Sequence, residues 1–171
     1  MSGGEGPGEA GAAGGAGATA GVPPPPGYVR LTLGDDPFVQ SIGPLYGRAD
    51  EAREKRLVLG LRVERRHCNP AGFCHGGMLM SMADMLLVIG SNLQAGLDRF
   101  TSTVSLSADF LAPVPQGAWL EGRLEVLRAT RNLVFCQGIY RVDGAPVMRL
   151  DGIVKPVGEP SAEFSGRRWF A

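Results

Sequence analysis

The sequence predicts one α+β domain in which an antiparallel β-sheet curls around a single long, buried α-helix. Three observations indicate this: a strand-like apolar segment at residues 57–63, an apolar segment of helical length from residue 76, and four strand-like segments after it. With 171 residues, the chain is long enough for one domain with a sizeable core. We expect this domain to span residues 28–158.

The two ends of the chain differ from the domain in composition. Residues 1–27 are dominated by Gly, Ala and Pro, contain no Lys or Arg, and end in the proline run 23–26. Such a composition cannot bury enough apolar surface to offset chain entropy. We therefore expect a disordered tail over residues 1–27. For residues 159–171 we expect a solvated C-terminal tail.

The first half of the domain carries three local signals. Residues 36–41 fit a short helix, with Asp35 or Asp36 as its cap and Pro37 in its first turn. Residues 57–63 alternate between large apolar side chains and others, which is typical of a half-buried strand. Turn-forming residues then predict a loop over residues 67–73.

Four strand-like segments follow the central helix, at residues 104–110, 119–129, 133–142 and 147–157. In the first of them Val104, Leu106, Ala108 and Phe110 alternate with polar residues, so we expect these four side chains to face the core. The dipeptide Asp143–Gly144 predicts a hairpin turn. Because Ala145 and Pro146 follow it, we expect a loop longer than two residues.

The central helix runs from about Gly76 to Gln94, stops at Gly96, and carries one charge, Asp84. Its faces are nearly all apolar, which indicates burial by protein; an acid in the middle of a short apolar run argues against membrane insertion. A carboxylate in such surroundings should be hard to ionise, as general bases and nucleophiles often are. The alternative is a structural acid hydrogen-bonded to Ser81 or another neighbour.

Gly76 and Gly77 open this helix. The amides of a first helical turn have no partner within the helix, so they can hold a developing oxyanion, and glycine lets a ligand approach closely. Gly76 and Asp84 are eight residues apart, which is roughly 12 Å along one helix. That is too far for both to touch one carbonyl group. We therefore expect at least a dimer, in which Asp84 of one chain faces the Gly76 amide of another.

Charge and cysteine content exclude several classes of function. Lys plus Arg and Asp plus Glu number 17 each, so nothing indicates nucleic-acid binding. The N-terminus has no secretory or myristoylation signal, so we expect a cytoplasmic protein. The three cysteines fit unpaired thiols better than a disulfide framework. The pairs His67–Cys68 and Cys74–His75 invite a metal interpretation, but their spacing matches no zinc pattern, and we expect no metal site.

The pattern Asn69-x-x-Gly72-x-x-His75-Gly76-Gly77, with Ala83-Asp84 and then Thr103-Val104-x-Leu106-x-x-x-Phe110-Leu111-x-Pro113, resembles the hotdog-fold acyl-CoA thioesterases of the phenylacetyl-CoA thioesterase type. The resemblance covers residues 57–157. It implies a hotdog fold and hydrolysis of an acyl-CoA to a carboxylic acid and free coenzyme A, with no cofactor. It also implies a homo-oligomer with shared active sites, either a dimer or a tetramer.

The resemblance implies a role for each motif residue. Asp84 aligns with the carboxylate that acts as nucleophile or as base for a water, and Gly76 with the amide that polarises the thioester oxygen. Asn69 and His75 align with residues near the same carbonyl, and Thr103 with a hydroxyl that positions the attacking water. Each of these three has a simpler reading: Asn69 as a turn residue, His75 as a helix cap, and Thr103 as a residue with high strand propensity.

For coenzyme A, the resemblance implies contacts from Gly77 and from a basic turn before the strand at residues 133–142. Arg128 and Arg131 stand there, and guanidinium groups suit phosphate, while Asn132 replaces a second basic residue of many relatives. Two other functions stay open. One is a hotdog hydratase or dehydratase of acyl thioesters, and the other is an acyl-CoA-binding module without activity. Neither needs nucleic acid or a membrane.

Overall fold

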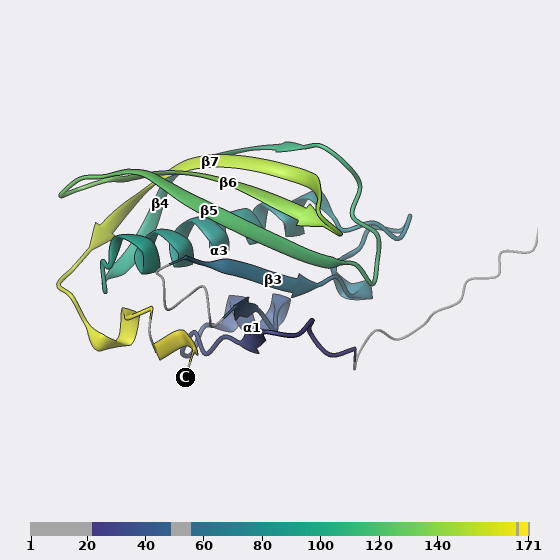
Figure 1. Cartoon of the computed structure of the whole chain (residues 1–171), viewed down its shortest axis with the longest axis horizontal. Helices are drawn as coiled ribbons and strands as arrows, with labels where there is room; N and C mark the ends of the chain where they lie inside the picture. The colour runs from purple at the N-terminus through teal and green to yellow at the C-terminus, as the bar shows by residue number, and fades with distance from the viewer. Residues whose placement is uncertain (1–21, 49–55, 167, 171) are drawn as a thin grey trace, which may run out of the picture.

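A seven-stranded antiparallel sheet curls around the long helix α3 (Gly76–Ala95), as Figure 1 shows. This computed structural model describes residues 22–48, 56–166 and 168–170. The architecture confirms the predicted α+β fold. Neighbouring strands follow the order β1-β2-β3-β5-β6-β7-β4. Their bounds are β1 (Tyr28–Arg30), β2 (Tyr46–Arg48), β3 (Val58–Arg62), β4 (Phe100–Phe110), β5 (Trp119–Ala129), β6 (Val134–Val142) and β7 (Ala145–Val157).

Helix α3 fills the concave side of the sheet. It begins after the N-cap His75 and ends at Gly96, whose left-handed φ of 60° is the usual helix stop. Glycines on β6 and β7 let the helix approach closely: a Cβ added to Gly152 would lie 2.7 Å from Leu87 Cδ2. By length and composition alone α3 could cross a membrane. Here its buried side chains pack into the core of the domain, as in the core helix of a soluble fold.

Strand β3 is buried on both faces, whereas its sequence predicted a half-buried strand. Val58, on the face opposite Leu59, is fully buried, and the Trp119 ring covers Gly60. The Trp119 ring in turn packs against Tyr28 and Tyr46, with ring centroids 4.9 and 5.5 Å apart. Tyr28 and Tyr46 belong to β1 and β2, two short strands that the sequence did not predict. The rings of Trp119, Tyr28 and Tyr46 thus gather over the second face of β3 at Gly60.

A β-bulge in β4 changes which side chains face the helix. Thr103 pairs with Val154 and Ser105 with Ile153, so Val104 has no partner residue on β7. Val104 is 57% exposed, although the alternation predicted it in the core. Before the bulge the odd-numbered residues Thr101 and Thr103 are the less exposed ones, and after it the even-numbered ones are. The expectation for Phe110 is also wrong, because its side chain is 51% exposed.

The hairpin between β6 and β7 has a two-residue turn, not the longer loop we expected. Val142 pairs with Ala145, and both turn residues have positive φ, 49° at Asp143 and 83° at Gly144. Positive φ at both central residues defines a type I′ turn, which matches the twist of antiparallel strands. The register between β6 and β7 shifts between Tyr140 and Arg141, and Pro146 pairs with Arg141 at this irregularity. A proline is tolerated at such a position in a sheet.

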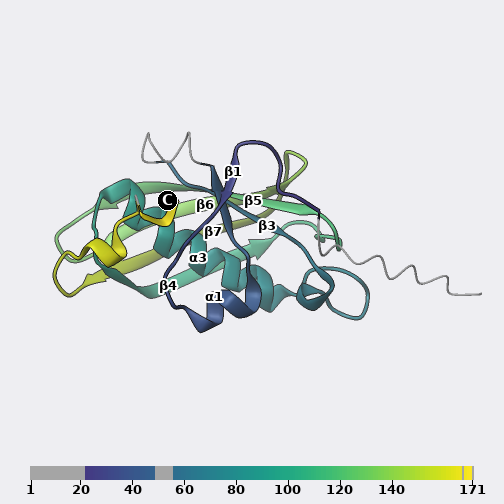
Figure 2. The same cartoon turned by 90° about the horizontal axis from the view of Figure 1, so that it is seen from below.

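The segments outside the sheet lie against different parts of the domain, and Figure 1 shows α1 (Pro37–Ile42) below β3. Helix α1 is capped by the Asp36 carboxylate, as predicted, and Figure 2 shows it below α3. The two single-turn 3₁₀ helices Ala162–Phe164 and Arg168–Phe170 end the described chain. The prediction of a solvated tail over residues 159–171 is wrong at Trp169, which is 8% exposed and accepts the Thr32 N–H. In the tail predicted at residues 1–27, residues 1–21 lie outside the described residues.

Candidate functional site

The side chains of Asp84 and Thr103 meet between α3 and β4. The Thr103 hydroxyl donates a hydrogen bond of 2.5 Å to the Asp84 carboxylate oxygen Oδ1, a length typical of a bond to a charged acceptor. Both residues are half-buried in the single chain, so Asp84 is less buried than its apolar neighbours predicted. The alternative partner Ser81 is not involved, because its hydroxyl donates to the Gly77 carbonyl. Asp84 therefore keeps a surface that solvent or a substrate can reach.

Buried polar side chains hold the start of β4 in register with α3. The Asn92 side chain donates to the Arg99 carbonyl over 2.6 Å and to the Thr101 hydroxyl over 3.2 Å, and it accepts the Asp98 N–H. These bonds pin the connection between α3 and β4. The bulge at Val104 follows directly and keeps Thr103 on the helix side of the strand. The Asp84–Thr103 contact thus depends on Asn92 as well as on the bulge.

The first turn of α3 presents backbone amides that have no acceptor among the described residues, and the Gly76 N–H is one of them. His75 is the N-cap: its Nδ1 atom accepts the Gly77 N–H over 3.0 Å. In the part of the chain that the structure describes, the Gly76 N–H donates to no backbone or side-chain oxygen. The positive end of the helix dipole lies at this amide. The geometry therefore leaves the Gly76 amide for an anion or a polarised carbonyl, whereas the Gly77 amide is occupied by the cap.

The loop before α3 has its own internal hydrogen bonds. The Asn69 side-chain oxygen accepts the N–H groups of Ala71 and Phe73, over 3.0 and 3.2 Å. This is the turn role that the sequence left open for Asn69. Only the NH₂ side of the carboxamide then stays available as a donor. His75 likewise adopts the capping role, although its ring is exposed.

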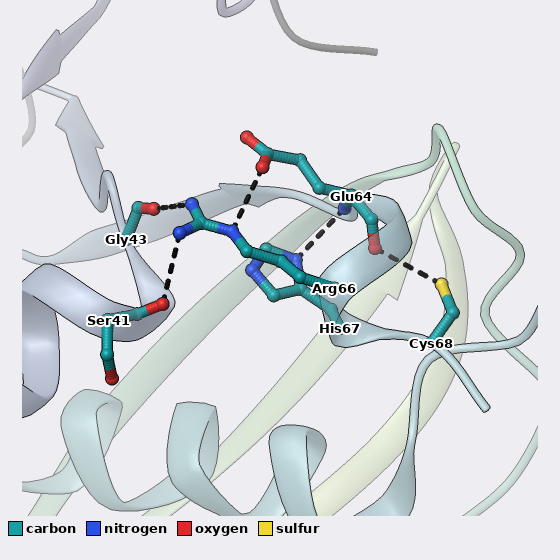
Figure 3. A network of polar contacts seen from close by, with 6 residues as sticks. All are labelled: Ser41, Gly43, Glu64, Arg66, His67 and Cys68. Atoms are coloured by element: carbon teal, nitrogen blue, oxygen red, sulfur yellow. Dashed lines mark hydrogen bonds and ion pairs between the residues drawn. The ribbon is translucent and has the colours of Figure 1, made fainter. Parts of the chain in front are cut away.

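A polar network anchors this loop to α1. The Arg66 guanidinium donates to the carbonyls of Ser41 and Gly43 and pairs with the Glu64 carboxylate over 3.0 Å (Figure 3). His67 is 4% exposed, and its Nδ1 accepts the Glu64 N–H over 2.9 Å. Burial, helped by the positive charge of Arg66, lowers the pKa of His67 below its usual value. His67 is therefore a neutral, structural residue at neutral pH.

The predicted coenzyme A contacts lie elsewhere in the same chain. Arg128, Arg131 and Asn132 are exposed at the turn between β5 and β6. Figure 1 shows this turn at the end of the sheet where α3 finishes, opposite the end where Gly76 begins it. Across the sheet, Arg128 pairs with Phe135, Phe135 with Ile153, and Ile153 with Ser105. Arg128 is thus three strands away from β4 and the Asp84–Thr103 contact.

The predicted site residues thus form three groups within one chain. Asp84 and Thr103 form the first; Asn69, His75, Gly76 and Gly77 form the second; Arg128, Arg131 and Asn132 form the third. Within residues 22–48, 56–166 and 168–170, no three His, Cys, Asp or Glu side chains are grouped to hold a metal ion. His67 and His75 use their Nδ1 atoms for the backbone contacts described above.

The sequence analysis did not place the Phe110 side chain near the site. A Cβ added to Gly76 would lie 3.7 Å from the Phe110 ring atom Cζ, so this ring is next to the free amide. Phe110 was expected in the core on the basis of plain alternation. It is the last residue of β4, and no sequence signal marked it as exposed.

Three comparisons place this chain among known proteins. The sequence profile of the thioesterase superfamily matches residues 71–145, which contain α3 and strands β4 to β6. A putative esterase of Pseudomonas aeruginosa is 32% identical over 111 residues, which cover 65% of this chain and 81% of that protein. The Escherichia coli PaaI protein from the phenylacetic acid degradation operon has the same fold, with a TM-score of 0.63 and 19% identity, over 74% of this chain and 88% of that one.

A third similar protein is a hypothetical thioesterase of Streptococcus pneumoniae whose structure was solved with coenzyme A. Its TM-score is 0.57 at 18% identity, with 62% of this chain and 84% of that chain covered. At these identities the solved structures establish the hotdog fold, while the superfamily profile and the esterase relative establish the family. The chain therefore belongs to the thioesterase superfamily, as a hotdog-fold thioester hydrolase.

Proposed function

We propose that the protein hydrolyses an acyl-CoA thioester to a carboxylic acid and free coenzyme A, at sites that two copies of the chain share. One observation carries this proposal: the unpartnered Gly76 amide opens the same helix that carries the half-exposed Asp84–Thr103 pair. Coenzyme A is supported by the S. pneumoniae protein, whose structure was solved with that molecule.

In the proposed reaction, Asp84 supplies the attack on the thioester carbonyl. As a base, its carboxylate takes a proton from a water whose oxygen bonds to the carbonyl carbon; as a nucleophile, it bonds to that carbon itself and water later hydrolyses the anhydride. In both routes the carbonyl oxygen gains negative charge, which the Gly76 N–H and the Asn69 NH₂ group stabilise. The intermediate then expels the coenzyme A thiolate, which takes up a proton. Thr103 holds one Asp84 oxygen and leaves the other for the attack.

Helix geometry supports the shared site. Gly76 and Asp84 are separated by eight residues, about 12 Å along α3, so one thioester cannot reach both in the same chain. Among the described strands, β4 pairs only with β7, and its 11 residues leave one edge free. Exposed apolar side chains lie along it at Phe100, Val104 and Phe110. A long free apolar edge usually pairs or is covered, and a second copy would bring its own α3 alongside.

The coenzyme A phosphates are proposed to contact Arg128 and Arg131. In a shared site these residues would come from a different copy than the Gly76 amide, which fits their distance from it within one chain. Replacing both with alanine should raise KM for acyl-CoA severalfold and change kcat little, because surface arginine–phosphate contacts act on binding. A glutamine at both positions is the matched control for side-chain length.

The deciding experiment is a thiol-release screen with purified full-length protein. Short, long, branched and aromatic acyl-CoAs are assayed beside an acyl-carrier-protein thioester, with the Asp84→Asn variant in parallel. We expect release from at least one acyl-CoA, and a 10²–10⁴-fold lower kcat in Asp84→Asn with the oligomer intact. Near-normal turnover in the variant would remove Asp84 from the mechanism. Hydration of an enoyl thioester without thiol release, or tight binding with neither reaction, would replace the hydrolase by one of the alternative functions.

A further inference from the structure

Cys68 and Cys74 face each other across the base of the loop that carries Asn69. The two residues form an isolated antiparallel bridge. On one side of it the His75 N–H donates to the His67 carbonyl, and on the other the Asn69 N–H donates to the Phe73 carbonyl, both over 2.8 Å. The cysteines lie between these two bonds and share none. They are therefore a non-hydrogen-bonded cross-strand pair, the closer of the two kinds.

This geometry is close to that of a disulfide. Directly opposite residues of an antiparallel pair project their side chains on the same face, and in a non-hydrogen-bonded pair their Cα atoms are about 4.5 Å apart. Disulfides span Cα separations of about 4.4 to 6.8 Å, most often about 5.5 to 6 Å. Both thiols are free in this structure. A bond between their sulfurs thus requires a small displacement of the backbone and no unfolding.

We propose that Cys68 and Cys74 are a redox-active pair, oxidised to a disulfide by a small-molecule disulfide, and that this bond lowers the activity of the adjacent site. The second half of the proposal rests on the thioesterase function proposed above; the first half does not.

The reaction balances as two successive exchanges. The Cys68 thiolate attacks one sulfur of the small disulfide, forms a mixed disulfide, and releases one thiolate. The Cys74 thiol then loses its proton and attacks the Cys68 sulfur, which expels the second thiolate. The two protons of the cysteines end on the two released thiols. Two protein thiols are oxidised, and one small disulfide is reduced.

The surroundings indicate which cysteine reacts first. Cys68 is half-buried, and its thiol donates to the Glu64 carbonyl over 3.3 Å (Figure 3), whereas Cys74 is 6% exposed. Burial raises the pKa of both thiols, that of Cys74 to about 12, and the nearby Cys68 thiolate adds to the rise at Cys74. Arg65 partly offsets the effect at Cys68. We therefore expect Cys68 to attack first, at a rate that increases with pH between 7 and 9.

The position of Cys68 and Cys74 in the chain is the reason why we expect their disulfide to lower the activity. Asn69 directly follows Cys68, and His75 and Gly76 directly follow Cys74. Because the cross-strand separation is at the short end of the disulfide range, the bond should push the two backbones apart by up to about 1 Å. A displacement of this size at an oxyanion site can lower turnover by up to about 10²-fold. The Gly76 amide and the Asn69 carboxamide would both move.

The test uses reduced full-length protein incubated with glutathione disulfide, then denatured in acid and alkylated. We expect the oxidised protein to take up one alkyl group where the reduced protein takes up three. Before alkylation, the mass of the oxidised protein should be lower than that of the reduced protein by two hydrogens. In the same sample, thioester turnover should fall at least tenfold and return after dithiothreitol. The alkylation readout does not depend on any enzymatic activity, so its failure is distinct from a failure of the proposed function.

Variants identify the pair. Cys68→Ser should keep its turnover in glutathione disulfide, and Cys74→Ser should stop at a mixed disulfide with one glutathione. The matched control is Cys136→Ser, which removes a buried thiol on β6 and should respond like the wild type. Three alkyl groups on the treated wild type, or a Cys136→Ser variant that no longer forms the internal disulfide, would overturn the proposal. An internal disulfide with unchanged turnover would overturn its regulatory half.

Discussion

The Thr103 hydroxyl lies 2.5 Å from the Asp84 carboxylate because a bulge at Val104 turns Thr103 toward the helix. Without this extra residue, the alternation of β4 would place Val104 on the helix side and Thr103 on the outer face. A single irregular residue therefore determines which side chain accompanies the acid. The contact joins a residue in the middle of α3 to the edge strand of the sheet.

The first prediction concerns this contact. Thr103→Val removes the hydroxyl and keeps the shape, so it should lower kcat roughly 10- to 100-fold, since a hydrogen bond to a charged group contributes about 1.5–3 kcal/mol. Thr103→Ser keeps the donor and should stay within a few-fold of the wild type. Steady-state thiol release measures both. Equal kcat in the valine and serine variants would show that the hydroxyl has no part in turnover.

A second prediction separates the role of the Gly76 N–H from the effect of adding a side chain at this position. Gly76→Pro deletes the N–H at the first helical position, where proline is tolerated, and His75 already has the extended ψ of 140° that a residue before proline prefers. We expect kcat to fall about 10²–10³-fold, as for the loss of one oxyanion donor.

Gly76→Ala is the matched control, because its Cβ would be in ordinary contact with the Phe110 ring at 3.7 Å while the amide stays. Its kcat should remain within a few-fold of the wild type, and the melting temperatures of both variants should be measured alongside. If the alanine variant were as impaired as the proline variant, crowding beside Phe110 and not the lost donor would be the cause.

The third prediction addresses the sharing of sites. Asp84→Asn and Gly76→Pro, each inactive alone, are mixed under conditions that exchange subunits. Half of the dimers then contain one copy of each, and one of their two sites is intact, so about one quarter of the wild-type activity should return. A mixture of Asp84→Asn and Thr103→Val, whose altered residues belong to the same half-site, should regain nothing beyond its residual rate. A site contained in one chain predicts no recovery in either mixture.

The fourth prediction is a pH dependence of stability that arises at His67. Its folded-state pKa is lowered by burial and by Arg66, so below about pH 6.5 the unfolded chain binds more protons at this residue than the folded chain. The contribution is present above the unfolded pKa and is lost as the pH falls toward the folded one. Urea unfolding should therefore give a free energy of unfolding that declines from pH 7 to pH 5.5.

His67→Gln tests this assignment. A glutamine oxygen can accept the Glu64 N–H that His67 Nδ1 accepts now, but it does not titrate. The decline between pH 7 and 5.5 should then become shallower, even if the variant is less stable overall. A decline of the same slope in the variant would assign the pH dependence to other groups.

Local patterns were sufficient for the central helix, α1 and the five longer strands of the fold. The ends of α3 are set by a cap and a left-handed glycine, and the turn at Asp143 and Gly144 by two residues that accept positive φ. These features depend on residues within a few positions of one another, which is why the sequence predicted the helix and the four strands after it. The motif that pointed to the hotdog family is also local, since it lies mostly between residues 69 and 113.

The sequence by itself determined the central helix with its single acid, the strands that wrap it, and the glycine amides at its start. Only the tertiary structure decided which side chains meet. The bulge in β4 brought Thr103 to Asp84, the Trp119 ring covered Gly60 on the second face of β3, and Trp169 packed back onto the core. The physical reason is range: caps and periodicity act over neighbouring residues, whereas strand register and burial depend on partners that are distant in the chain.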